Sequence, residues 1–408
     1  MKNILILTNL HMWSMDKAKG GRAFYSTVKG FIDAGWNVWF VSSGGSIPSG
    51  LLNQNQTYEK EFKLIDKSYR TSKIKVIYRL SKLLRVLLTF RFLYKTGKAI
   101  LKRNNNGEFI LYAYEVDAVL AARKLSIIYN APLVTRFQGT VHYLTNDTLF
   151  NRCWFMPHLS ALKTCADLTI MTNDGTKGLQ TLVKLGNKSK KVLFWRNGVD
   201  QVPSPILLNR DNIRKQLGIC DNIVFLTVSR LGGWKRVDRA ITAFAEVYKE
   251  YPSISLFIVG DGDKKHDLEH LARALGVDHA VNFTGSVSQE DIYNYMIAAD
   301  VFLSFYDLSN VGNPLMEAMR CGKPIITLDN GDTKEIITNG ENGILISESE
   351  ISRIPREMKR LIEDKEYSLK IAIGAKAYAN REFWTWDERI DSEIKEIEAL
   401  RQQHYRIS

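Results

Sequence analysis

Residues 223–259 read IVFLTVSRLGGWKRVDRAITAFAEVYKEYPSISLFIV. Both ends of this stretch are continuous apolar runs, as expected for strands that are buried on both faces of a parallel sheet. An apolar stripe at helical spacing lies between them and consists of Val237, Ile241, Phe244 and Tyr248. The stretch therefore predicts a strand–helix–strand unit with parallel strands.

The same alternation of strand and helix patterns extends along the whole chain. In the first half, strands are expected at Asn3–Thr8, Trp36–Ser42, Phe109–Ala113, Pro132–Phe137, Leu168–Thr172 and Val192–Trp195. In the second half, they are expected at Ile223–Val228, Ile254–Val259, Val281–Thr284, Val301–Phe305, Pro324–Leu328 and Gly343–Ile346. The pattern predicts an α/β protein with two facing Rossmann-like domains, each a doubly wound parallel sheet, with the ligand in the cleft between them.

Length and composition agree with this organisation. The chain has 408 residues, of which 45% are hydrophobic and 25% charged, so a disordered chain and a small disulfide-stapled scaffold are excluded. No apolar run is long enough to span a membrane. The cysteines lie far apart without a CxxC pair, which indicates a reducing cytoplasm and neither zinc nor disulfides; they are Cys153, Cys165, Cys220 and Cys321.

The positive charge is concentrated in one segment. Thirteen Lys or Arg residues and one acid, Asp66, lie between Lys63 and Arg103, so this segment alone accounts for the chain's net charge of +12. Within it, one helix face is expected to be apolar and the other basic. The apolar face consists of Ile77, Leu80, Leu84, Leu87 and Leu88, and the basic face of Lys75, Arg79, Lys82 and Arg85.

This basic amphipathic helix has two interpretations. The four cations can dock the protein on an anionic membrane surface, or the apolar face can pack on the protein's own sheet while the cations face solvent. Binding of nucleic acid is less well supported, because the segment has no recognition motif and little interleaving of glycine and aromatic residues.

Three segments carry candidate chemistry. Gly20-Gly21 follows the first strand, and glycines at such a turn let backbone amides approach a phosphate, although a plain turn is an equal alternative. Arg230 and Lys235 follow another strand, where they can neutralise a diphosphate or simply be solvated. Glu317 stands one turn into the helix that starts near Asn313-Pro314, where it can accept hydrogen bonds from sugar hydroxyls or be a surface acid.

Taken together, these and further motifs resemble a known family. In order, they are Val228-Ser229-Arg230-Leu231, Ile258-Val259-Gly260-Asp261-Gly262, Phe283-Thr284-Gly285-Ser286-Val287, Leu315-Met316-Glu317-Ala318-Met319, Gly322-Lys323-Pro324 and Gly340-Glu341-Asn342-Gly343. This part of the chain resembles the nucleotide-sugar domain of family-4 retaining glycosyltransferases with the GT-B fold. The resemblance is dense from Val228 to Ile346 and looser before Ala166. It implies a C-terminal helix that crosses back to the first domain, so the domains are expected at 1–200 plus 385–408 and at 201–384.

The resemblance also implies roles. Arg230 and Lys235 would hold the donor diphosphate and stabilise the leaving group, and Glu317 would bind the donor ribose. Further donor contacts would come from Gly20, Gly21, Gly285, Val287, Asn313, Pro314 and Leu315. No metal or other cofactor is expected, and a metal role for Asp261 and Asp263 is a weak alternative.

Two positions depart from the family pattern. Ser309 stands eight residues before Glu317, where the family usually has the first Glu of its pair, which contacts the donor sugar. Gln138 stands where the family usually has a His near the transferred sugar. The departures indicate an unusual donor sugar or substitutes recruited from Arg136, His142, Asp174 or Asp307. Gln138 is kept as a catalytic candidate and Ser309 as a donor-binding candidate.

We therefore expect a metal-independent, retaining glycosyltransferase. It would transfer a sugar from a nucleoside diphosphate to a cell-surface glycan, lipid-linked if the basic segment docks on a membrane. It would be cytoplasmic and peripheral on the inner face of the cell membrane. The alternative is a non-catalytic subunit with a glycosyltransferase-like fold, supported by Ser309 and Gln138; a basic nucleic-acid binder is a third reading.

Overall fold

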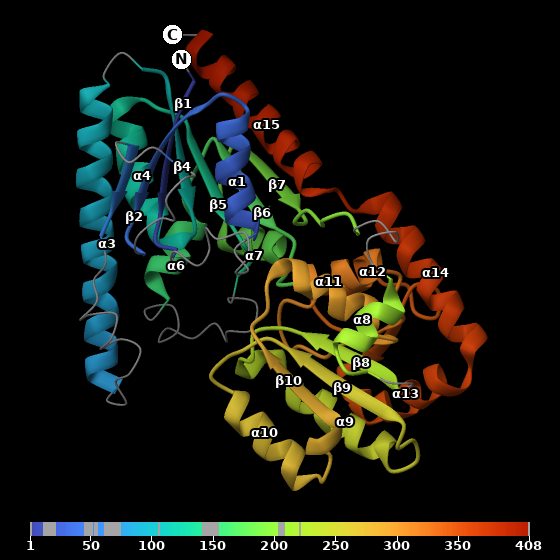
Figure 1. Ribbon diagram of the computed structural model, residues 1–408. Coiled ribbons are helices and arrows are strands. Elements are labelled where there is room, and N and C mark those ends of the chain that lie inside the picture. Colours follow the sequence, from blue (N-terminus) through green and yellow to red (C-terminus); the bar gives the residue numbers. More distant parts are fainter. Residues whose placement is uncertain are drawn as a thin grey trace. The chain divides into compact units, whose positions relative to one another are not determined.

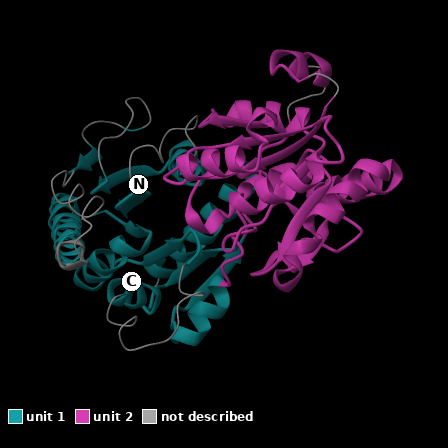
Figure 2. Cartoon of the chain, turned by 90° about the horizontal axis from the view of Figure 1, so that it is seen from below, with its two compact units in different colours: residues 1–173, 178–195, 387–408 teal, residues 174–177, 196–386 magenta. Residues whose placement is uncertain are grey.

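The computed structural model describes residues 2–10, 22–44, 52, 56–60, 75–104, 107–140, 155–202, 209–219 and 222–406, without the side chains of residues 75–79. The chain divides into two compact units, coloured teal and magenta in Figure 2. Unit 1 comprises Met1–Asn173, Gly178–Trp195 and Asp387–Ser408, and unit 2 comprises Asp174–Lys177 and Arg196–Trp386. The C-terminal segment thus belongs to the first unit, and a short piece of the first half belongs to the second.

Unit 1 contains a seven-stranded sheet in the order β3-β2-β1-β4-β5-β6-β7. Its strands are β1 (Asn3–Thr8), β2 (Asn37–Ser42), β3 (Thr57–Glu59), β4 (Phe109–Tyr114), β5 (Leu133–Phe137), β6 (Leu168–Thr172) and β7 (Lys191–Trp195). All neighbouring strands are parallel. The order reverses between β1 and β4, as in a doubly wound sheet.

Helices cover both faces of this sheet (Figure 1). One face packs against α3 (Lys75–Arg103), α4 (Val116–Tyr129), α6 (Met156–Leu162) and α7 (Gly178–Leu185). The other packs against α1 (Arg22–Asp33) and α15 (Trp386–Arg406). Each strand is buried by this arrangement, which explains why β1 and β4 are apolar without alternation.

Unit 2 repeats the design with six parallel strands in the order β10-β9-β8-β11-β12-β13. The strands are β8 (Ile223–Val228), β9 (Ile254–Val259), β10 (Val281–Gly285), β11 (Val301–Ser304), β12 (Ile325–Asp329) and β13 (Ile344–Ser347). One face packs against α9 (Val237–Tyr248), α10 (Lys265–Ala274) and α13 (Ile354–Glu363). The other packs against α8 (Arg210–Gln216), α11 (Gln289–Ala298), α12 (Asn313–Arg320) and α14 (Lys365–Glu382). The predicted fold class is confirmed.

The C-terminal helix α15 is anchored to unit 1 through buried charges. Glu393 accepts hydrogen bonds from Arg136 of β5 and Arg389 of its own helix, each at 2.8 Å, and from the Tyr112 hydroxyl at 2.5 Å. The side chains of these four residues are almost completely inaccessible to solvent. Arg136 therefore belongs to a structural cluster, which removes it from the set of residues that could substitute at the sugar site.

Candidate functional site

The candidate site of unit 2 lies where its strand order reverses. Strands β8 and β11 pair side by side there, so the loops that follow them leave the same edge of the sheet in neighbouring positions. In open α/β sheets, this reversal opens a crevice at the carboxyl ends of the strands. The first loop carries Arg230 and Lys235, and the second carries Ser309.

The loop after β8 is fixed by glycines in a neighbouring turn. The Leu231 amide donates to the Asp261 carbonyl at 2.9 Å, and the Lys264 amide donates to the Leu231 carbonyl at 3.0 Å. Gly260 has φ +133°, and a Cβ built there would stand 1.9 Å from the Ser229 carbonyl oxygen. Only glycine fits so close to the backbone in this conformation, so the Gly-Asp-Gly turn supports the loop that carries Arg230.

The loop after β11 is held by the side chain of Asn310, which is buried. Its Oδ1 accepts from the Tyr306 amide at 3.2 Å, and its Nδ2 donates to the Tyr306 carbonyl at 2.7 Å. Ser309 adopts φ +61°, which is strained for a residue other than glycine. Positive φ outliers of this kind are common at binding sites, where the surrounding structure holds them.

Lys235 connects the two loops. Its Nζ lies 4.2 Å from the centroid of the Tyr306 ring and donates to the Ser309 carbonyl at 3.3 Å. Burial lowers the pKa of Lys235 to about 8, against the opposing effect of Asp174. A partly desolvated ammonium at this edge can bind a phosphate more strongly than a solvated one. Arg230 is exposed on the same loop.

Helix α12 begins at this edge with Gly312 as its N-cap. The predicted donor amides are those of Asn313, Pro314 and Leu315. Pro314 has no N–H, and the Leu315 amide already donates to the Gly312 carbonyl at 3.1 Å. Of the three residues, Asn313 is thus the one whose amide can serve a ligand; its Oδ1 accepts from the Asn197 amide group at 3.2 Å.

Glu317 is buried on α12, with 2% of its surface exposed. Its Oε1 accepts from the Gln289 amide group of α11 at 2.8 Å. It is therefore not a surface acid, and its carboxylate is of a type that accepts hydrogen bonds from hydroxyl groups. Gly285 ends β10 with φ +74°, and Val287 packs against the core between the sheet and α11.

Three of the predicted catalytic and donor-binding residues belong to the first half. Gln138 follows β5 in unit 1; its Nε2 donates to the Tyr114 hydroxyl at 2.5 Å, and its backbone amide donates to Glu115 at 2.8 Å. Gly20 and Gly21 lie outside the described residues, as does His142. The role predicted for Gln138 at the sugar therefore stays a prediction.

The basic face of α3 differs from the expected arrangement. The Nζ of Lys82 lies 5.5 Å from the Phe155 ring centroid, and burial lowers the pKa of Lys82. The positive charges of Arg85 and Lys82 act to lower the pKa of the Asp117 carboxyl group in α4, against the effect of its burial. These two cations therefore face the protein. The side chains of Lys75 and Arg79 lie outside the described part.

The apolar face of α3 points to solvent, contrary to the interpretation in which it packs on the sheet. Of the predicted face, Leu80, Leu84 and Leu87 are 62%, 46% and 55% exposed, whereas Leu88 is half-buried. The side chain of Ile77 lies outside the described part, and Leu83, beside this face, is 56% exposed. The sheet is instead covered by the second half of the helix, through Leu93, Ile100 and Leu101. Helix α3 extends well beyond the predicted apolar face. The leucines of its first half are therefore exposed to solvent, while its second half packs on the sheet.

The other candidate chemistry is less well supported. Among the described residues, no three His, Cys, Asp or Glu side chains gather as metal ligands. Asp307 forms ion pairs with Arg236 and Arg239, so its carboxylate is already used. None of the described helices combines the length and the apolarity that crossing a bilayer requires.

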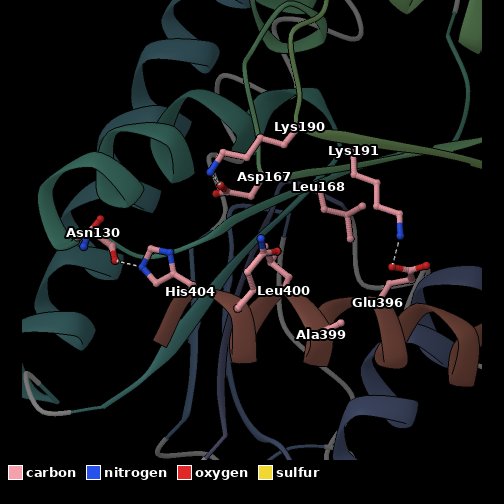
Figure 3. Close-up of a pocket in the computed structure, with 10 residues that line it drawn as sticks. Asn130, Asp167, Leu168, Lys190, Lys191, Glu396, Ala399, Leu400 and His404 are labelled. Carbon is pink, nitrogen blue, oxygen red and sulfur yellow. Dashed lines mark hydrogen bonds and ion pairs between the residues drawn. The ribbon is translucent and has the colours of Figure 1, made fainter. Parts of the chain in front are cut away.

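A hollow of about 650 Å³ in unit 1 lies between α15 and the amino ends of β6 and β7 (Figure 3). Its charged side chains pair with one another: Lys190 with Asp167 at 2.7 Å and Lys191 with Glu396 at 2.5 Å. It is at the opposite edge of the sheet from the loops where doubly wound proteins bind ligands, so it is no candidate for the predicted chemistry.

Comparison with known proteins gives relatives for the second half. Residues 209–378 match the family described as glycosyl transferases group 1. A GDP-mannose-dependent alpha-(1-6)-phosphatidylinositol monomannoside mannosyltransferase of Mycolicibacterium smegmatis is 27% identical over 187 residues, which are 44% of this chain and 49% of that protein. An alpha-monoglucosyldiacylglycerol synthase of Streptococcus pneumoniae is 31% identical over 227 residues, 55% of this chain and 51% of that protein. The chain thus spans about half the length of these relatives.

Solved structures match the whole chain. HepE of Anabaena in complex with UDP and glucose has a TM-score of 0.72 at 21% identity, covering 98% of this chain and 100% of that one. Sucrose-phosphate synthase from Thermosynechococcus elongatus has a TM-score of 0.76 at 17% identity, with 100% of each chain covered. At these identities the likeness establishes the fold. The chain has the GT-B fold, and its residues 209–378 match the model of the group 1 glycosyl transferase family.

Proposed function

We propose that this chain transfers a sugar from a nucleoside diphosphate to a glycan acceptor. The observation that supports the proposal best is the partly buried Lys235, whose ammonium bridges the two loops at the switch point of unit 2. A diphosphate is the part of a nucleotide sugar that such a cation would bind. HepE, which shares the fold, was solved with UDP and glucose.

In the proposed reaction, the bond between the sugar and the diphosphate breaks on the face that the acceptor attacks. The leaving phosphate takes the acceptor's proton, so the anomeric configuration is retained without a protein nucleophile. Lys235 and Arg230 stabilise the charge that develops on the leaving group, and Glu317 binds the ribose. The charges of Lys235 and Arg230 would do the work that a metal would otherwise do, so the proposal includes no metal.

We propose further that the acceptor is lipid-linked and that α3 brings the protein to the inner face of the cell membrane. Four exposed leucines form one stripe on the first half of this helix: Leu80, Leu83, Leu84 and Leu87. Exposed cations continue the same helix at Arg91, Lys95 and Lys98. Leucines that insert among acyl chains next to cations that meet anionic headgroups are typical of an interfacial helix. The names of two relatives contain a lipid, a phosphatidylinositol monomannoside in one and a monoglucosyldiacylglycerol in the other.

The transferase proposal is tested by measuring the melting temperature of the protein with a panel of UDP- and GDP-sugars. A bound donor stabilises the fold by mass action, so at least one donor should raise the melting temperature. Slow release of the nucleoside diphosphate from that donor should then be measurable. Stabilisation without any release, with or without glycan acceptors, would favour the non-catalytic subunit, and no stabilisation by any donor would contradict the proposal.

The membrane proposal is tested by flotation with vesicles of phosphatidylglycerol and phosphatidylcholine. Leu83→Asp together with Leu87→Asp should abolish binding, because two charges would enter the acyl region. Leu369→Asp is the matched control, since Leu369 is 61% exposed on α14 of the other unit. Equal binding of the double variant and the control would contradict docking through α3.

A further inference from the structure

A short segment from the first half of the chain is built into the candidate site. Residues Asp174–Lys177 lie between β6 and α7, both of unit 1, yet they belong to unit 2. The Val311 amide donates to the Asp174 carbonyl at 3.1 Å, and the Lys177 amide donates to the Asp332 carboxylate at 3.1 Å. These bonds fix the segment to the loops that follow β11 and β12.

Close backbone contacts show that this placement is specific. A Cβ at Gly175, which has φ +88°, would stand 2.9 Å from the Val311 amide nitrogen. A Cβ at Gly331 would stand 2.0 Å from the Gly175 carbonyl oxygen. Both positions need glycine, because any side chain would push the segment off the loop. Asp174 is therefore held next to Ser309 by the backbone itself.

The carboxylate of Asp174 points into the cluster of Lys235 and Ser309. Its Oδ1 accepts from the Thr176 amide at 3.2 Å and from the Thr176 hydroxyl at 2.6 Å. Ser309 also hydrogen-bonds to it, and Lys235 is near enough to act on it electrostatically. The side chain is partly exposed, and a carboxylate has about four acceptor positions, so it can bind a further donor.

The other acid among the predicted substitutes is committed elsewhere. Asp307 is held by Arg236 and Arg239. Ser309 itself offers a hydroxyl and no negative charge. Asp174 is thus the acid that lies beside the cation proposed to hold the diphosphate. The sugar of a nucleotide sugar is bonded directly to that diphosphate, so its hydroxyls would come close to Asp174.

We propose that Asp174 accepts a hydrogen bond from a hydroxyl of the donor's sugar and supplies the carboxylate that position 309 lacks. The proposal rests on the proposed function and adds a specificity residue from the first half of the sequence. Because a carboxylate bonds more strongly than a neutral amide to a hydroxyl, Asp174 contributes to binding of the sugar and leaves binding of the nucleoside diphosphate to Lys235 and Arg230.

The test compares the dissociation constants of nucleotide sugars with those of the matching nucleoside diphosphates. UDP-glucose with UDP and GDP-mannose with GDP are titrated calorimetrically into the wild type, and the pair that binds is used. Asp174→Asn should weaken binding of the nucleotide sugar by about 10- to 100-fold, as expected for a lost hydrogen bond to a charged group. Binding of the nucleoside diphosphate should change by less than about threefold.

Asp278→Asn is the matched control, because Asp278 is exposed at the amino end of β10 and should leave both constants unchanged. Asp174→Ser, which removes the carboxylate without adding an amide, serves as the second variant if Asp174→Asn does not fold. Equal weakening of nucleotide sugar and diphosphate, or no change in either, would overturn the role of Asp174. Failure of the wild type to bind any of the four probes would contradict the proposed function as well.

Discussion

Two half-buried lysines of unit 2 have similarly lowered pKa values at opposite edges of one sheet. Burial lowers the pKa of both Lys235 and Lys323 to about 8. Lys323 precedes β12 and donates to the carbonyls of Ile297 and Ala299, at 3.1 and 2.8 Å, at the end of α11. Lys235, at the carboxyl edge, donates to one carbonyl at 3.3 Å and otherwise lies over an aromatic ring. Lys323 thus caps the end of α11, whereas the ammonium group of Lys235 keeps hydrogen-bond donors for a ligand.

Unit 1 shows what happens when such a cation is fully enclosed. Arg136 comes from β5, but its charge is neutralised by Glu393 of α15, and the side chain has no exposed surface. The cluster of Arg136, Arg389 and Glu393 joins the C-terminal helix to the sheet. Solvent access, more than the type of residue, therefore separates a structural cation from a candidate binding one.

The largest effect is expected from breaking the enclosed cluster. Glu393→Ala should lower the free energy of unfolding by about 3–5 kcal/mol, because two arginines would be left buried without their carboxylate. Chemical denaturation measures this directly. Glu396→Ala on the same helix is the control: its pair with Lys191 is partly exposed, at 28% and 53%, and should contribute less than about 1 kcal/mol. A similar decrease in the free energy of unfolding for both variants would mean that burial of the ion pair does not determine its contribution to stability.

The next effect contrasts the two lysines. Lys235→Met should lower kcat/KM for the donor by roughly 10²–10³-fold, about 3–4 kcal/mol, since the charge on the leaving diphosphate loses a fixed partner. Lys323→Met should change the melting temperature and leave kcat/KM near that of the wild type. Steady-state kinetics with the donor found by thermal shift measures both. Loss of activity in both variants to the same degree would remove the distinction.

A smaller effect should appear in the pH dependence. Lys235 is charged below about pH 8 and loses its proton above it, so kcat/KM should fall above pH 8 and approach tenfold per pH unit. Lys235→Arg should remove this alkaline limb. The folded pKa values of Lys235 and Lys323 lie below that of an unfolded lysine, so their contribution to stability rises with pH above about 8. A fall in activity that follows unfolding would contradict this origin.

Much of the fold was predictable because strands that are buried in a parallel sheet have continuous apolar sequences, which can be recognised locally. All the expected strands form, with ends shifted by one residue at several of them; the short edge strand β3 was missed because three half-buried residues carry no pattern. The orientation of α3 was not predictable, because the spacing of its leucines shows which residues share a face but not where that face points.

The site was predictable only where its residues follow strands directly. Arg230 and Lys235 do so after β8, and parallel strands bring their carboxyl ends to one edge. The position of Asp174 beside Ser309 depends on contacts 135 residues apart in sequence, which no local pattern encodes. The sequence alone left Asp174 as one of four candidates, and the ion pairs of Arg136 and Asp307 set those two apart.

The contact between Lys235 and a diphosphate can be measured most directly by NMR of protein labelled with ¹³C-lysine. The Cε signals of Lys235 and Lys323, assigned from Lys235→Arg and Lys323→Arg, are followed against pH with and without saturating UDP or GDP. The bound phosphate should raise the pKa of Lys235 from about 8 by at least about one unit, while that of Lys323 stays near 8. An unchanged pKa of Lys235 with nucleotide bound, or equal shifts at both lysines, would contradict the account.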